Sequence, residues 1–244
     1  MQTSRGSTLK GVITISLMAV NVVFWVPILL VVALAKLLIP LAAWRRWTSA
    51  LMIWIAQAWI SCNGAIFSLM GALQLEVEGV AGLDPRSWYL VLSNHQSWVD
   101  ILVLQKAFNR RIPFLKFFLK QELIWVPVIG LAWWALDFPF MKRGKGSGAR
   151  QNDLKTTREA CEKFKLIPTT VINFVEGTRC TPAKKTAQQS PYRHLLKPKI
   201  GGLGIALAAM GEQFEALLDV TIVYPRGTPD FWHLLCGQID AVTV

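Results

Sequence analysis

Trp88–Ser93 (WYLVLS) is a short apolar run that leads directly into the polar turn Asn94–Asp100 (NHQSWVD). A run of this length favours a buried β-strand, and the spacing of apolar residues after the turn predicts a helix through Ala107. Two more strands are predicted further along the chain, at Thr169–Phe174 and Leu217–Val223. Strands that alternate with helices predict an α/β fold.

The intervening segments are consistent with this alternation. A strand is expected at Gln74–Gly79, and helices are expected at Asn152–Lys165 and Gly202–Glu215. Two stretches are expected to be loops, the Gly-rich basic Arg143–Arg150 and the polar Cys180–His194. Gln121–Trp134 is apolar but too short to span a membrane, which favours a helix or loop lying against the membrane or the core. Gln238–Val244 is typical of a strand, and it fits either a truncated form of a longer protein or a short terminal strand.

The composition indicates a membrane protein. Hydrophobic residues make up 53% of the 244 residues, mean hydropathy is +0.39, and charged residues make up only 17%, against about 25% in typical globular chains. The net charge of +11 fits nucleic acid, anionic lipid or an acidic substrate. The hydropathy favours lipid, and the absence of a zinc-finger or RNP-type pattern argues against nucleic acid.

Two long apolar runs, Gly11–Trp44 and Leu51–Leu75, predict two membrane helices. The chain is therefore divided into an N-terminal membrane hairpin at residues 1–75 and an α/β domain at residues 76–244.

The charges around this hairpin favour a re-entrant arrangement. Arg45 and Arg46 are expected in the connection between the helices, and two spanning helices would place them opposite the basic remainder of the chain. A hairpin that enters one leaflet and returns keeps all these charges on one side, with Pro27 and Pro40 as break points. Two ordinary spanning helices remain the alternative.

The four cysteines have no C-x-x-C spacing and fall in unrelated segments. This predicts neither a metal site nor a disulfide framework. Reduced thiols indicate a cytosolic compartment.

The first candidate site is the turn that contains His95 and Asp100. The five-residue spacing can bring the carboxylate to the imidazole, which fixes the tautomer and leaves the second ring nitrogen free to take a proton from a substrate hydroxyl. A structural His in a turn is the alternative.

The second candidate site is Glu176–Arg179 (EGTR), which follows an apolar strand. Strand ends are where α/β sheets bind ligands. Gly177 permits close backbone approach, and Thr178 and Arg179 can donate to phosphate oxygens. A solvated turn with a Glu–Arg pair is the alternative.

The two sites together resemble the 1-acyl-glycerol-3-phosphate acyltransferase family, whose blocks are N-H-x-x-x-x-D, K-x-E-L-x-x-x-P-x-x-G, F-P-E-G-T-R and a strand ending near Pro. The corresponding residues here are His95 with Asp100, Lys120–Leu123 with Pro127 and Gly130, Glu176–Arg179, and Val220–Pro225. Val175 replaces the usual Pro, and the sequence after Arg179 is similar to the branch that contains lysocardiolipin acyltransferases and their bacterial inner-membrane relatives.

The resemblance implies a glycerolipid acyltransferase fold, with a mixed sheet flanked by helices, and an active site on the cytoplasmic face of a bacterial inner membrane. It implies transfer from acyl-CoA or acyl-carrier protein to the sn-2 hydroxyl of lysophosphatidate, without a metal or another cofactor. His95 would be the general base and Asp100 would orient it. Acceptor binding would fall to Glu176, Gly177, Thr178, Arg179, Lys120 and Arg143.

Other functions remain open. The acceptor is another lysophospholipid in one alternative, and the chain is a non-catalytic lipid-binding scaffold in another. A thioesterase would need a nucleophile, and the sequence contains no G-x-S-x-G motif and no Cys with a base close in sequence.

Overall fold

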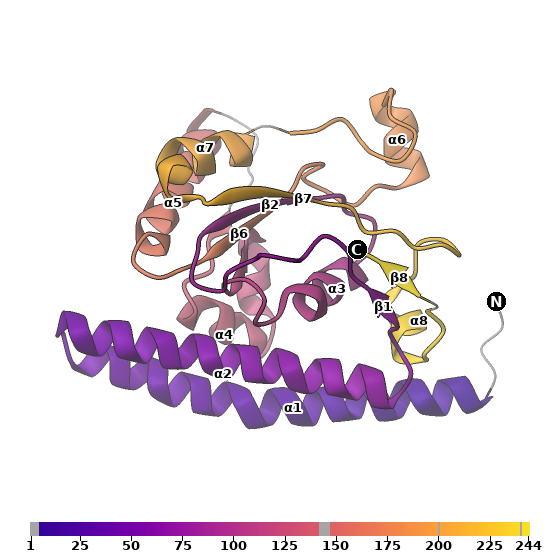
Figure 1. Cartoon of the computed structure of the whole chain (residues 1–244), viewed down its shortest axis with the longest axis horizontal. Helices are drawn as coiled ribbons and strands as arrows, with labels where there is room; N and C mark the ends of the chain where they lie inside the picture. Colours follow the sequence, from indigo (N-terminus) through magenta and orange to yellow (C-terminus); the bar gives the residue numbers. More distant parts are fainter. Residues whose placement is uncertain (1–4, 142–146, 200, 240) are drawn as a thin grey trace.

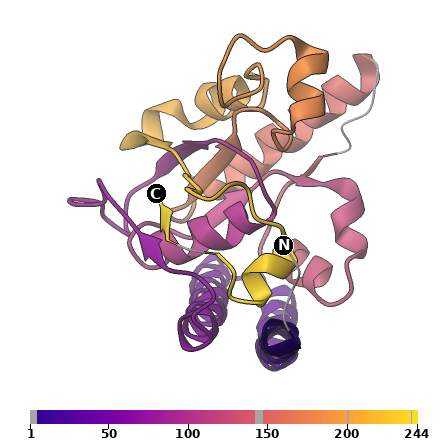
Figure 2. The same ribbon diagram turned by 90° about the vertical axis from the view of Figure 1, so that its right-hand side faces the viewer.

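The computed structural model describes residues 5–141, 147–199, 201–239 and 241–244. Two long antiparallel helices, α1 (Arg5–Leu38) and α2 (Ala42–Leu69), lie side by side beneath the rest of the chain (Figure 1). Both are long and apolar enough to cross a membrane by length and composition. Viewed along their axes, they lie on one side of the α/β layers (Figure 2).

Two details of this hairpin differ from the prediction. Pro27 lies inside α1 and does not end it; the packing of α1 along α2 outweighs the backbone hydrogen bond that proline removes. Arg45 and Arg46 belong to the first turns of α2 and not to the connection, because arginine is a good helix former and residues 39–41 are enough to reverse the chain.

The α/β domain is built on a four-stranded parallel sheet in the order β3 (Leu115–Phe117), β6 (Thr170–Phe174), β2 (Tyr89–Ser93) and β7 (Ala216–Val220). All pairings are parallel, so the carboxyl ends of the four strands meet at one edge. The predicted α/β fold is confirmed. Strand β3 was not predicted, because an alternation of apolar and polar residues over only three positions is too short to indicate a strand.

Helices cover both faces of the sheet (Figure 1). On one face α5 (Ser147–Phe164) and α7 (Gly201–Met210) bury a small core against β2 and β6. On the other face α3 (Val99–Phe108) and α4 (Ile129–Ala135) separate the sheet from the hairpin. The larger core on that face includes buried residues of α1 and α2.

The remaining elements are short. Two parallel strand pairs flank the main sheet, β1 (Leu75–Glu76) with β8 (Val242–Thr243) and β4 (Leu119–Lys120) with β5 (Phe140–Met141). The short helices are η1 (Gln121–Trp125), α6 (Pro182–Gln188), η2 (Gly211–Gln213) and α8 (Phe231–Leu235).

Two predicted loops contain helix. Residues 147–150 of the predicted basic loop belong to α5, while Arg143 lies outside the described residues. The polar stretch after Cys180 contains α6, because Thr181 caps it by accepting from the Lys184 N–H at 3.3 Å and Pro182 suits its first turn.

The hairpin is fastened to the domain near both ends of α1. A Cβ added to Gly11 would lie 2.8 Å from Cys236 Sγ, so α8 and the residue after it pack closely on the start of the helix. Near the other end, Lys36 Nζ lies 3.3 Å from Asp137 Oδ2, just beyond α4. The predicted division of the chain at residue 75 into two units stays a prediction.

Candidate active site

The candidate residues lie where the parallel strands end. Strand β2 ends at Ser93, directly before the His95 turn, and Ser93 is paired with Phe174 at the end of β6 and with Val220 at the end of β7. The turn that holds Glu176–Arg179 and the segment after Val220 are therefore its neighbours. This edge is where open α/β sheets bind ligands.

His95 and Asp100 form the predicted pair. His95 Nδ1 lies 2.9 Å from Asp100 Oδ2, which also accepts from the backbone N–H groups of Gln96 (2.6 Å) and Ser97 (2.9 Å). Asp100 Oδ2 acts as a hydrogen-bond acceptor toward both N–H groups, so it also accepts from the imidazole. Nδ1 of His95 therefore carries the proton, and Nε2 is left as a proton acceptor. Asp100 is completely buried in the first turn of α3, where the helix dipole favours a carboxylate.

Tyr224 is a residue of this site that was not predicted from the sequence. Its hydroxyl donates to Asp100 Oδ1 at 2.6 Å, so both carboxylate oxygens are occupied. Burial and the neighbouring carboxylate raise the pKa of Tyr224, which keeps the phenol protonated as a donor. The contact spans 124 residues of sequence, and its only local signal was a polar aromatic next to Pro225 after a strand.

The imidazole is held from a second side by aromatic rings. The rings of His95 and Phe174 stack with centroids 4.0 Å apart and an interplanar angle of 15°. The ring of Phe117 stacks in turn on Phe174, with a centroid distance of 5.9 Å. Asn94 fixes the backbone before the histidine, since its side chain accepts from the Ile222 N–H at 2.8 Å and donates to the Ile222 carbonyl at 2.9 Å. The ring orientation is therefore fixed by residues from β6, β3 and the segments that follow β2 and β7.

Glu176 is completely buried and faces the backbone. Its Oε1 accepts from the His95 N–H at 3.0 Å, and its Oε2 accepts from the Leu196 N–H at 2.8 Å. In this structure the carboxylate joins the His95 turn to the segment that contains Leu196. Its predicted part in acceptor binding stays a prediction.

Gly177 and Thr178 are half-buried in the turn of the second motif. Gly177 has φ of +64°, a conformation that favours glycine. Lys199 lies against its open side, and Lys184 Nζ donates to Thr178 Oγ1 at 2.7 Å. These two lysines were not predicted as site residues, because they lie in the stretch predicted as loop and beyond it.

Arg179 is exposed and stacks on an aromatic ring next to the histidine turn. Its guanidinium carbon lies 5.0 Å from the centroid of the Trp98 indole, which is a favourable cation–π geometry. Lys120 is exposed at the end of β4, and Arg143 lies outside the described residues. None of the contacts described for this site involves Lys120.

The cysteine near the site is poorly suited to be a nucleophile. The Cys180 backbone N–H donates to the His95 carbonyl at 2.7 Å. Burial raises the pKa of the Cys180 thiol, and Glu176 raises it further, so the reactive thiolate is disfavoured. Within the described ranges, no group of three or more His, Cys, Asp or Glu residues could hold a metal ion.

We expect Glu176→Gln to lower kcat by about 30-fold and stability by about 2 kcal/mol, because an amide has one acceptor oxygen and would turn an NH₂ group toward a backbone N–H. Initial rates at saturating substrates and thermal unfolding in detergent measure the two effects. Glu159→Gln, on the exposed face of α5, is the control and should match wild type in both. An unchanged melting temperature for Glu176→Gln would contradict the positioning role.

Fold and site together define an α/β protein with a His–Asp pair, its carboxylate buried, at the carboxyl edge of a parallel sheet and an arginine-containing turn beside it. The Acyltransferase family model matches residues 74–225, which contain the sheet and both motifs. The chain belongs to this family.

Curated relatives agree with the predicted resemblance. The 1-acyl-sn-glycerol-3-phosphate acyltransferase 3 of Arabidopsis thaliana is 27% identical over 79% of this chain and 53% of its own length. The epsilon enzyme of Mus musculus is 28% identical over 61% of this chain and 46% of its own length. This chain thus spans about half the length of these relatives.

One solved structure has the same fold. The crystal structure of the 1-acyl-sn-glycerophosphate (LPA) acyltransferase PlsC from Thermotoga maritima matches 97% of this chain and 82% of its own, with a TM-score of 0.60 and 22% identity.

Proposed function

We propose that this chain transfers a fatty acyl group from a thioester donor, acyl-CoA or acyl-carrier protein, to the sn-2 hydroxyl of lysophosphatidate, giving phosphatidate. The observation that carries the proposal is the fixed His95–Asp100 pair beside the Glu176–Arg179 turn. The names of the relatives support the acceptor.

The reaction needs a base and a charge-stabilising environment. Nε2 of His95 removes the proton of the acceptor hydroxyl as its oxygen attacks the thioester carbonyl. The tetrahedral oxyanion collapses, the C–S bond breaks, and the imidazolium returns the proton to the thiolate. Asp100 stabilises the imidazolium, and the reaction passes through no covalent enzyme intermediate.

The oxyanion would be held on the Gly177–Thr178 turn. The Gly177 N–H already donates to the Phe174 carbonyl at 2.8 Å, so the Thr178 hydroxyl is the better candidate donor. Its oxygen accepts from Lys184, which polarises the O–H toward a developing negative charge. Arg179 would contact the acceptor phosphate, with Glu176, Lys120 and Arg143 assigned to the same region by resemblance.

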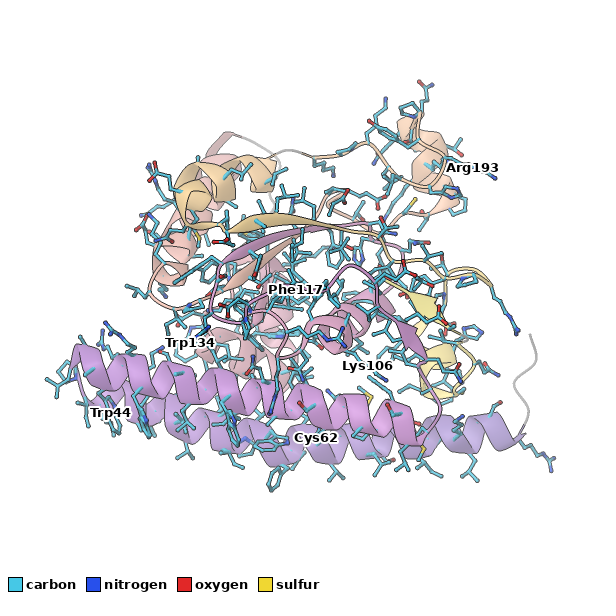
Figure 3. All side chains as sticks on the ribbon, in the orientation of Figure 1. Trp44, Cys62, Lys106, Phe117, Trp134 and Arg193 are labelled. Carbon is cyan, nitrogen blue, oxygen red and sulfur yellow. The ribbon has the colours of Figure 1, made fainter. Side chains whose placement is uncertain are left out.

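The hairpin would hold the enzyme at the membrane without crossing it. Gly11 and Lys36 both contact the α/β domain, and they are about 38 Å apart along a helix that rises 1.5 Å per residue. Because the hydrocarbon core is about 30 Å thick, a spanning α1 would draw the domain into the bilayer. The outer side chains of the hairpin project away from the domain (Figure 3), and many of the exposed ones are apolar, among them Val20, Phe24, Val31, Trp47 and Trp54. A hairpin embedded in one leaflet, on the cytoplasmic face of a bacterial inner membrane, accommodates these observations.

A membrane-impermeant maleimide tests this placement. Arg46→Cys, made in a chain without its four cysteines, should be labelled from the same face as Lys155→Cys on the exposed surface of α5, because a charged residue near the start of α2 would lie in the headgroup region. Labelling of position 46 only from the opposite face would show that the helices span.

The function is tested by acyl transfer in liposomes with labelled acyl-CoA or acyl-carrier protein and a panel of lysophospholipids. Transfer to lysophosphatidate is the expected result. Transfer confined to another lysophospholipid would keep the mechanism and correct the acceptor. No transfer with either donor would favour a non-catalytic lipid-binding scaffold.

A further inference from the structure

Residues 195–199 form a strap across the carboxyl end of β6. Leu196 is completely buried, and its N–H donates to Glu176 Oε2 at 2.8 Å. Further along, the Lys199 N–H donates to the Val175 carbonyl at 2.7 Å. These two backbone bonds hold the strap on the residues that directly precede Gly177, so the position of Lys199 is set by buried contacts.

The strap places the Lys199 side chain on Gly177. A Cβ added to Gly177 would lie 3.0 Å from Lys199 Cδ and 3.8 Å from its Nζ, so the aliphatic part of the lysine occupies the space that the glycine leaves open. This contact accounts for a glycine here in addition to its φ of +64°. The ammonium group is thereby held beside the turn that follows β6.

Helix α6 supplies a second lysine to the same turn. Lys184 Nζ donates to Thr178 Oγ1 at 2.7 Å and to the Arg179 carbonyl at 3.2 Å. Thr181 caps α6 and so fixes the start of the helix that carries Lys184. Two ammonium groups from separate segments therefore approach the Gly177–Arg179 turn.

This concentration of positive charge has no ion-pair partner among the described residues. In the part of the chain that the structure describes, no carboxylate lies within 4.0 Å of the charged nitrogens of Lys184, Lys199 or Arg179. Glu176, the acid of the motif, accepts from two backbone N–H groups on its buried side. Cations that converge without a carboxylate repel one another, and a dianion placed among them removes that cost.

We propose that Lys184 and Lys199 join Arg179 in binding a substrate phosphate group, an inference that rests on the proposed acyl transfer. Ammonium groups act as point charges toward phosphate oxygens, while Arg179 supplies two directed donors. The phosphate is that of the lysophosphatidate acceptor or one of those on coenzyme A, and both present the same chemistry to the three cations.

The test compares Lys184→Gln, Lys199→Gln and the double variant with Lys185→Gln. Lys185 is the matched control, because it lies on the same short helix, loses the same charge, and directs its ammonium to the Arg193 carbonyl. KM values are measured for lysophosphatidate, for acyl-CoA and for an acyl-pantetheine donor that lacks the nucleotide phosphates. Binding of inorganic phosphate is measured separately by calorimetry.

Each single variant should raise one of the two KM values about tenfold, as expected for a lost hydrogen bond to a charged group, while kcat changes less. A rise for lysophosphatidate places the acceptor phosphate at the lysines. A rise for acyl-CoA that vanishes with acyl-pantetheine places the donor phosphates there. Unchanged KM values, or the same rise in Lys185→Gln, would overturn the proposal.

The outcome is separable from that of the proposed function. If wild type transfers acyl groups and His95→Ala does not, the function stands whatever the lysine variants show. If wild type transfers none, the calorimetry still decides, because wild type should bind inorganic phosphate at least tenfold more tightly than the double variant. Equal phosphate binding would then reject the lysine site.

Discussion

His95→Ala is expected to lower acyl transfer to lysophosphatidate by about 10³-fold or more, because the substrate hydroxyl loses its general base. The loss should appear in kcat, with the KM values for both substrates changed by less than about threefold, since the imidazole acts on the hydroxyl proton and not on the phosphate. The measurement is the initial rate in liposomes at saturating donor and acceptor.

The chain contains its own control for this experiment. His233 on α8 also has a ring nitrogen close to a carboxylate, with Nδ1 2.7 Å from Asp230 Oδ1, but its ring takes part in none of the hydrogen bonds described for the His95 turn or the Glu176–Arg179 turn. His233→Ala should retain wild-type transfer. Comparable losses in both variants would indicate unfolding, and full activity in His95→Ala would reject the proposed base.

The sequence predicted the centre of the site because its signals are local. Strand β2 is a short apolar run followed at once by polar residues, and strand β6 is mostly apolar and leads through Val175 into the Glu176–Arg179 turn. The His95–Asp100 pair spans only five positions across a helix start. Patterns over so few positions can be predicted, because the backbone geometry between the residues is determined by the local secondary structure.

The parts that were missed depend on contacts between distant segments. Tyr224 reaches Asp100 across 124 positions, and Leu196 reaches Glu176 across 20. The spacing of apolar residues in the sequence does not predict such long-range contacts. Glu176 shows the same limit, because the sequence around it does not reveal that its carboxylate accepts from the backbone N–H groups of His95 and Leu196.

The membrane hairpin was predicted as two apolar runs, while its attachment to the domain was not. The contacts of Gly11 with α8 and of Lys36 with Asp137 join residues more than 100 positions apart. They orient the hairpin relative to the sheet, and so determine which side of the domain the two apolar helices cover.

Asp100→Asn is expected to lower kcat by about 10³-fold while the protein stays folded. The amide of the variant fits the site in one orientation. Its oxygen replaces Oδ2 and accepts from the Gln96 and Ser97 N–H groups and from His95 Nδ1. Its NH₂ group then faces the Tyr224 hydroxyl, which can rotate to accept a hydrogen bond. The Nδ1–H tautomer is therefore kept, and what is lost is the negative charge that stabilises the imidazolium in the transition state.

Two comparisons separate this charge effect from a structural one. Asp219→Asn, on an exposed position of β7, should leave kcat unchanged, and Tyr224→Phe, which keeps the carboxylate but removes one donor, should lower kcat by only about tenfold. The decisive variant combines His95→Ala with Asp100→Asn. Since the aspartate acts through the imidazole, the double variant should be no slower than His95→Ala alone, as residues that act as a unit are not additive. Multiplied losses in the double variant would mean that Asp100 serves the reaction independently of His95, and the dyad would have to be abandoned.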